Sequence, residues 1–230
     1  MEKRSSARQM FKTGFAVGIF LSMLSAFQNC TVASPKAESS SDSGTSKASS
    51  CKLRAALETQ PLNPAIATEK YSAAKTLLDK KTSGDSRFEV LANYVNAANN
   101  AEQFEEAESP AKDILHEANS VIPTIDGGYA LHEAHTLLGR LALKKGNLAL
   151  AKEHFRQAGQ VPPSPRLRAL GPNMSLAKDL LEKGDCNDVL DYLQNISKLW
   201  NDDLAKKSSS EWMSNIVSGQ MPDFRGNLFY

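Results

Sequence analysis

The sequence predicts an all-α protein whose ordered part is a short α-solenoid, a row of antiparallel helix pairs behind a disordered amino-terminal tether. Three observations carry this prediction. Hydrophobic residues make up 41% of the 230 positions and aromatic residues only 7%, a composition that suits helix-on-helix packing. Strand signals are nearly absent. Small and apolar residues recur at fixed spacing along residues 51–230, which we take as one helical repeat domain.

The best-defined repeat unit spans residues 131–163. In its second helix Ala151, Phe155 and Ala158 are spaced by four and then three residues, which places them on one helical face. In its first helix Gly139 is small where two antiparallel helices would cross closely. A turn at Gly146-Asn147 separates the two helices. Leu138, Ala142 and Pro163 complete the pattern.

The same register is found in two further units, about 88–123 and 170–200. In the later unit the positions equivalent to Gly139, Gly146, Ala151, Phe155 and Ala158 are Ala177, Gly184, Val189, Leu193 and Ile196. In the earlier unit Ala111, Leu115, Ala118 and Pro123 reproduce the spacing of Ala151, Phe155, Ala158 and Pro163. Extra residues at 125–128 and 163–165 are expected to lengthen the joints between units.

This register resembles the tetratricopeptide repeat, with Ala142 in place of an aromatic residue. The run 164–200, together with Pro222-Asp223-Phe224, also resembles bacterial tetratricopeptide-like proteins of unassigned function. The resemblance implies stacked helix-turn-helix units that act as a binding module. It implies no activity.

Both ends of the repeat domain are expected to be capped, because an end unit has an apolar face without a neighbour. A helix with Ile66, Tyr71, Ala74, Leu77 and Leu78 should follow Pro64 and stop at Ser83-Gly84. Ser208 and Glu211 have capping-box spacing, which predicts a second capping helix that ends at Gly219. This carboxy-terminal cap spans 208–230, and its apolar tail should fold back onto the last repeat.

Residues 1–30 have the layout of a signal peptide, with a basic start and an apolar stretch from Thr13 to Phe27. The stretch is shorter than the roughly 20 residues that span a bilayer, which disfavours a permanent transmembrane helix. Cys30 follows it directly, an arrangement that resembles a bacterial lipoprotein leader and implies lipidation of Cys30, although Phe27 and Asn29 depart from the lipobox. Cleavage after Ala33 is the competing route and would release a soluble protein.

The segment 31–50 is predicted to be a disordered, serine-rich linker. Eight of the seventeen residues from Ser34 to Ser50 are serine. Such a composition buries too little apolar surface to offset the entropy of ordering. The segment therefore suits a flexible tether between a membrane anchor and the repeat domain.

Charge and cysteine content exclude several classes of function. Four of the 27 basic residues and one of the 26 acidic residues lie in the first thirty positions, so the remainder carries a formal charge of −2. A neutral domain disfavours nucleic acid as a partner. Three cysteines are too few and too far apart for a zinc site. Cys51 and Cys186 either form a disulfide in an oxidising compartment or remain free thiols.

No catalytic constellation, phosphate-binding loop or cofactor motif is present in the sequence. His132 and His135 lie three residues apart on a predicted helix and could share a metal ion, although histidines that serve packing or lie on the surface explain them as well. A basic stretch from residue 140 to 168 follows an acidic stretch from 102 to 113. The candidate residues for binding an anionic protein or peptide are Arg140, Arg166, Arg168, Asn173 and Lys178.

The sequence thus favours an exported, non-enzymatic interaction or scaffolding module of the bacterial cell envelope, anchored to the membrane through Cys30. Two alternatives stay open. One is an envelope enzyme or metal-binding protein that uses His132 and His135. The other is a structural subunit of an envelope assembly.

Overall fold

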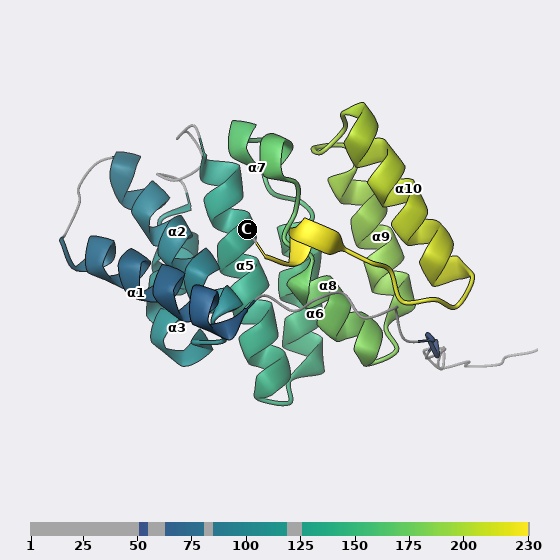
Figure 1. Ribbon diagram of the computed structural model, residues 1–230, viewed down its shortest axis with the longest axis horizontal. Helices are drawn as coiled ribbons and strands as arrows, with labels where there is room; N and C mark the ends of the chain where they lie inside the picture. The colour runs from purple at the N-terminus through teal and green to yellow at the C-terminus, as the bar shows by residue number, and fades with distance from the viewer. Residues whose placement is uncertain (1–50, 55–62, 81–84, 119–125, 230) are drawn as a thin grey trace, which may run out of the picture. The chain divides into compact units, whose positions relative to one another are not determined.

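The computed structural model describes residues 51–54, 63–80, 85–118 and 126–229, and these are helical without any strand (Figure 1). The helices are α1 (Pro64–Asp79), α2 (Asp85–Asn100), α3 (Phe104–His116), α5 (Gly127–Lys144), α6 (Leu148–Ala158), α7 (Pro165–Leu170), α8 (Ser175–Glu182), α9 (Cys186–Ile196), α10 (Asp203–Val217) and the 3-10 turn η1 (Arg225–Leu228). The predicted signal peptide with Cys30, the linker 31–50 and Pro123 lie outside the described residues.

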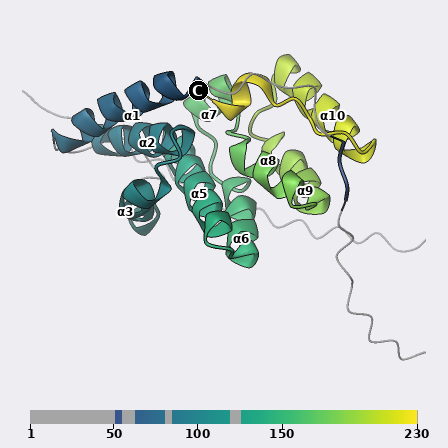
Figure 2. The same cartoon turned by 60° about the horizontal axis from the view of Figure 1, so that its bottom comes forward.

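Helices that follow one another along the chain pack side by side. Helix α2 packs against α3, α5 against α6, and α8 against α9. Each pair also contacts the next pair, because α5 packs on both α2 and α3, and α6 contacts both α8 and α9. Helix α1 covers α2 at one end of this row and α10 lies beside α9 at the other (Figures 1 and 2).

The residues of the predicted register face the interior. Ala151, Phe155 and Ala158 of α6 are buried, and so are their counterparts in α9: Val189, Leu193 and Ile196. Ala111 of α3 is buried as well, while Leu115 and Ala118 are half-buried. The spacing of four and three residues therefore identified the buried face of α6 and α9. In α3 the prediction is corrected, because the buried face is formed by Phe104, Ala107, Ala111 and Ile114.

Glycine is favoured at the predicted positions for two reasons, which are close packing between helices and a positive φ angle. Gly139 lies where α5 meets its neighbours: an added Cβ atom would overlap Leu176 Cδ2 and would lie 3.4 Å from the carbonyl oxygen of Ala151. Gly146 and Gly184 end the first helix of their units with φ angles of 75° and 83°. Residues with side chains rarely adopt such angles, so glycine is favoured at both turns.

The predicted amino-terminal helix is present, although Ile66 and Leu77 of its expected apolar face are exposed and its predicted stop at Ser83-Gly84 lies outside the described residues. The start of the carboxy-terminal helix is corrected. Helix α1 begins at Pro64, after Asn63, whose side-chain oxygen accepts a hydrogen bond from the amide of Ala65 at 3.0 Å. The start predicted at Ser208 is wrong, because α10 begins at Asp203. There the side chain of Asp202 accepts a hydrogen bond from Ala205 N at 2.8 Å, which makes Asp202 the N-cap.

The apolar tail folds back, as predicted. Trp212 of α10 donates a hydrogen bond to the carbonyl of Asp223 at 2.9 Å and packs edge-on against Phe224, which is buried. Asn227 in η1 donates to the carbonyls of Leu170 and Pro172 at 3.2 and 3.1 Å. The tail thus covers both α10 and the connection between α7 and α8.

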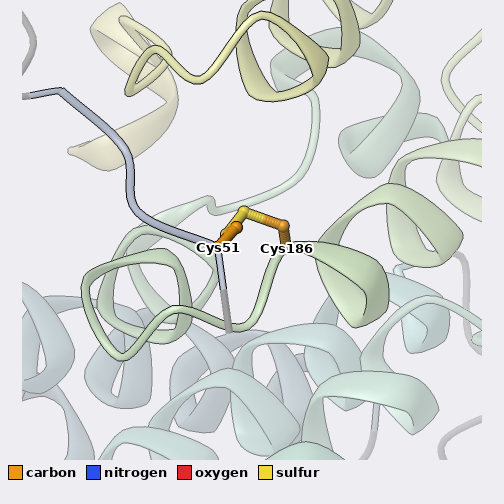
Figure 3. The surroundings of a disulfide bond; sticks show 2 residues. All are labelled: Cys51 and Cys186. Atoms are coloured by element: carbon orange, nitrogen blue, oxygen red, sulfur yellow. A yellow bond between two sulfur atoms is a disulfide. The ribbon is translucent and has the colours of Figure 1, made fainter. Parts of the chain in front are cut away.

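A disulfide joins Cys51 to Cys186 at the start of α9, with the two Cα atoms 6.0 Å apart (Figure 3). Backbone hydrogen bonds hold the same segment: Cys51 N donates to Gly184 O at 3.0 Å, and Arg54 N to Gly219 O at 2.9 Å. The structure therefore shows the disulfide and not two free thiols. It ties residues 51–54 to the carboxy-terminal part of the domain.

We expect Gly139→Ala to lower the free energy of unfolding by about 1 to 3 kcal/mol, because the new methyl group overpacks the site against Leu176. Combining it with Leu176→Val should recover part of the loss. The measurement is urea unfolding of the disulfide-bonded protein. Gly226→Ala is the matched control, since nothing lies within 4 Å of its Cβ position. Equal effects of the two alanines would contradict the close approach at Gly139.

Candidate functional site

A cluster of buried polar side chains lies where α2, α5 and the start of α8 meet. Glu133 of α5 is fully buried, and its Oε2 accepts hydrogen bonds from Asn96 at 3.0 Å and Asn173 at 3.3 Å. Asn99 donates to Ser175 Oγ at 3.1 Å, and Ser175 N donates to Asn173 Oδ1 at 3.1 Å. A buried carboxylate is costly unless donors surround it. These amides supply such donors, so the cluster links three successive parts of the chain.

Arg140, a candidate for partner binding, belongs to this cluster. Its Nε donates to Asp179 Oδ2 at 2.7 Å, and its Nη1 donates to the carbonyl oxygen of Asn99 at 3.0 Å. The guanidinium also lies over the ring of Phe104, 4.9 Å from its centroid. The side chain is only 14% exposed. Arg140 therefore holds α5 to α8 and α2 and does not present a free cation to a partner.

The other four candidates lie in different surroundings. Asn173 is buried, and its side-chain contacts are internal. The guanidinium of Arg166 stacks over Tyr129 at 4.2 Å, and Lys178 pairs with Glu182 within α8. Arg168 is exposed beside a small cavity of about 360 Å³. The binding surface predicted from these five residues is thus corrected, because two of them, Arg140 and Asn173, lie inside the domain.

The basic stretch that follows Arg140 is paired with the acidic stretch of the preceding unit. Lys144 Nζ lies 2.9 Å from Glu105 Oε1, and Lys145 Nζ lies 2.8 Å from Glu108 Oε2. The positive charges at the end of α5 are therefore paired with the negative charges of α3. Hydrogen bonds from Lys112 and Lys145 lower the pKa of Glu108 to about 2. Charges that are separated along the sequence are therefore brought together in the fold.

His132 is held in one tautomer inside the domain. Its Nε2 accepts a hydrogen bond from the backbone N–H of Asn173 at 3.0 Å, so the proton resides on Nδ1, which lies 3.1 Å from the carbonyl oxygen of Ala158. Both ring nitrogens are engaged. Burial lowers the pKa of His132 to about 4. His132 therefore cannot join His135 in a metal site without losing these contacts.

His135 instead meets His154 of α6. The two Nδ1 atoms are 3.0 Å apart, so one imidazole donates a hydrogen bond to the other. Burial, followed by the proximity of His154, lowers the pKa of His135 to about 3. The pKa of His154 is also lowered by burial. In the described ranges, three or more histidine, cysteine or acidic residues do not gather as a metal site would require.

A groove with a volume of about 690 Å³ lies between α6 and α9. Leu148, Ala149, Phe155 and Tyr192 line its apolar part. The rings of Phe155 and Tyr192 stack with centroids 4.2 Å apart. Leu148 is 43% exposed, so it adds accessible apolar surface to the lining of the groove.

The two walls of this groove differ in charge. The α6 wall carries Lys152 and Arg156 together with Glu153, which pairs with Arg156, and the α9 wall carries Asp188 and Asp191. Lys152 spans the groove at one point, where it lies 2.6 Å from Asp188 Oδ2. The sequence analysis did not identify this groove. Leu148, an exposed apolar residue three positions before Ala151 at the start of α6, was the signal that could have revealed it.

Comparison with known protein families, with curated proteins and with solved structures found no match to this chain. The site is therefore described by its own geometry. A search of the described helices for a long apolar stretch that could cross a bilayer found none.

The buried histidines should make stability depend on pH. In the unfolded chain both imidazoles take up protons near pH 6.5, whereas in the folded protein His132 does so only near pH 4 and His135 only near pH 3. The unfolded state binds more protons in this window. Stability should thus be complete above pH 6.5 and fall with pH below it, by up to about 1.4 kcal/mol per pH unit for each histidine.

Urea unfolding at pH 7.5, 6 and 5 measures this effect. These values avoid the range in which Glu108, with a pKa lowered to about 2, would contribute. His135→Gln should reduce the slope of stability against pH without abolishing it, since His132 and His154, whose pKa values burial also lowers, would remain. Equal urea midpoints at pH 7.5 and pH 5 in the wild-type protein would contradict the prediction.

Proposed function

We propose that this chain is a non-enzymatic interaction module of a bacterial cell envelope, in which a short tetratricopeptide-like α-solenoid binds a segment of a partner protein. The exported leader and the serine-rich linker position the module at a membrane. The groove between α6 and α9 is the observation that carries the proposal, because it is a sizeable apolar opening with an exposed leucine at its edge.

The spacing of the contacts supports a repeat architecture. Asn96 bonds to a residue 37 positions later, Arg140 to one 39 positions later, and Lys144 to one 39 positions earlier. These separations are close to the intervals of 38 and 40 residues between equivalent positions in the sequence. Residues in the same register of neighbouring units therefore touch, as expected when successive helix pairs stack in one direction.

The groove favours an amphipathic partner segment over a purely anionic one. Its floor offers aromatic and aliphatic side chains, which supply most of the binding energy in such grooves. Its α6 wall carries Lys152, Arg156 and Glu153, with one positive charge in excess, and its α9 wall carries Asp188 and Asp191. A helix with an apolar stripe flanked by an acidic and a basic edge would complement both walls, and this arrangement would fix its direction.

The disulfide supports export. Disulfides persist in oxidising compartments and are rare in the cytosol. Cys51 and Cys186 are bonded, and Cys51 lies directly after the segment that the sequence assigns to the linker (Figure 3). A domain with this bond is consistent with a leader that directs the chain out of the cytosol, and lipidation of Cys30 would then keep it at the membrane.

A photoreactive amino acid at position 148 tests the groove. In living cells of the source organism we expect it to form a discrete adduct with one partner protein. The same amino acid at position 204 is the control, since Leu204 is 68% exposed but lies on α10. Ala149→Arg, which places a charged side chain on the groove floor, should abolish the adduct at 148. Equal adducts from 148 and 204 would refute the groove as the binding site.

Cys30→Ala tests the anchor separately. If Cys30 is lipidated, the wild-type chain should incorporate labelled palmitate, and its processing should be blocked by globomycin. The variant should lose the label and, if it is cleaved after Ala33, leave the membrane fraction. A wild-type chain that is processed normally in globomycin and carries no label would show that it is secreted without lipid.

A further inference from the structure

His135 and His154 form an arrangement that neither the fold nor the proposed binding role requires. The rings belong to the two helices of one pair, α5 and α6, and their Nδ1 atoms are 3.0 Å apart. Their centroids are 5.3 Å apart. The centroid distance exceeds the nitrogen distance by about two ring radii. The two imidazoles therefore meet head to head, with both Nδ1 lone-pair directions along one line.

From this geometry we propose that His135 and His154 form a binding site for monovalent copper, with the metal held in linear coordination between the two Nδ1 atoms. Imidazole is a good ligand for copper. A filled-shell monovalent ion accepts two ligands on opposite sides, whereas zinc calls for four in a tetrahedron. The described residues offer no third histidine, cysteine or carboxylate in a metal-binding group with this pair, which disfavours zinc and favours copper in this oxidation state.

The nearest alternative ligands are already engaged. His132 uses both ring nitrogens, on Asn173 and Ala158. Glu153, next to His154 in sequence, accepts hydrogen bonds from Arg156 and Gln157. Two neutral imidazoles are thus the donors that remain. Burial lowers the pKa of both, which keeps them in the neutral form that binds metals.

Metal entry requires a small rearrangement. Two metal–imidazole bonds of about 2.0 Å in line span about 4 Å, so the ring nitrogens must separate by about 1 Å. His154 is half-buried and has room to move, whereas His135 is buried and fixed. The imidazole that donates the hydrogen bond must transfer its proton from Nδ1 to Nε2. Binding therefore exchanges one hydrogen bond for two metal–nitrogen bonds and releases no net proton.

Anaerobic titration with Cu(I) against a chromogenic chelator tests the site in the disulfide-bonded chain, with ascorbate as the reductant so that Cys51 and Cys186 stay oxidised. We expect one equivalent to bind, together with an X-ray absorption spectrum of two nitrogen ligands. His154→Gln retains an amide that can hydrogen-bond to His135 but offers no imidazole, so Cu(I) affinity should fall at least tenfold.

His116→Gln is the matched control, because His116 lies at the end of α3 and is not part of the pair; its Cu(I) affinity should equal that of the wild type. Circular dichroism establishes that each variant is folded. Unchanged affinity in folded His154→Gln, sulfur ligands in the spectrum, or no binding by the wild type would each overturn the proposal. The last result would leave the pair as a hydrogen bond only.

Discussion

The close approach of α5 to its neighbours is the constraint on which the rest of the structure depends. Helix α5 packs against α2, α3, α6 and α8, and every residue from Gly127 to Gly139 is buried. Contact on so many sides is feasible only where side chains are small. Gly139 admits Leu176, and Gly128 admits the carbonyl of Pro162 at a position that any Cβ atom would occupy. The second glycine also explains why the connection after α6 can cross the start of α5.

Burial on all sides also explains why polar residues of α5 are internal. His132 and Glu133 are fully buried and Arg140 is half-buried, and each has a partner from another helix, such as Asn173, Asn96 and Asp179. Directional bonds of this kind are satisfied only when the units stack in one register, since an unpaired buried carboxylate would cost several kcal/mol. The cluster therefore helps to fix how α2, α5 and α8 pack against one another.

Helix type and buried face could be predicted from the sequence, because the 3.6-residue period of small and apolar side chains determines both. The residues at which the helices begin could not be predicted in the same way. Residues 125–128 and 163–165 were expected to be joints, yet α5 begins at Gly127 and α7 at Pro165. The start of each of these helices depends on contacts with distant residues, such as Pro162 beside Gly128. Such contacts cannot be predicted from the local sequence.

Basic residues near the end of α5, which include the proposed partner-binding residue Arg140, pair instead with acidic residues that lie about one repeat interval earlier in the sequence. Arg140, Lys144 and Lys145 lie 37 to 39 residues after Glu102, Glu105 and Glu108, an interval close to one repeat. In stacked units, residues one period apart become neighbours. An acidic stretch followed one period later by a basic stretch thus predicts neutralisation between units, and not a polarised surface.

The disulfide decides how a load on the amino-terminal side of the domain is transmitted. Residue 51 is bonded to the start of α9, and Arg54 is hydrogen-bonded to Gly219 and Met221 beyond α10. Force applied before residue 51 therefore passes into α9 through a covalent bond. Without that bond the force would pass to α1, whose Ile66 and Leu77 are exposed and which packs against α2 and bonds to Glu106 of α3 through Tyr71 and Lys75. End helices open more readily than interior ones, so the disulfide keeps this force from acting on α1, the first helix of the row.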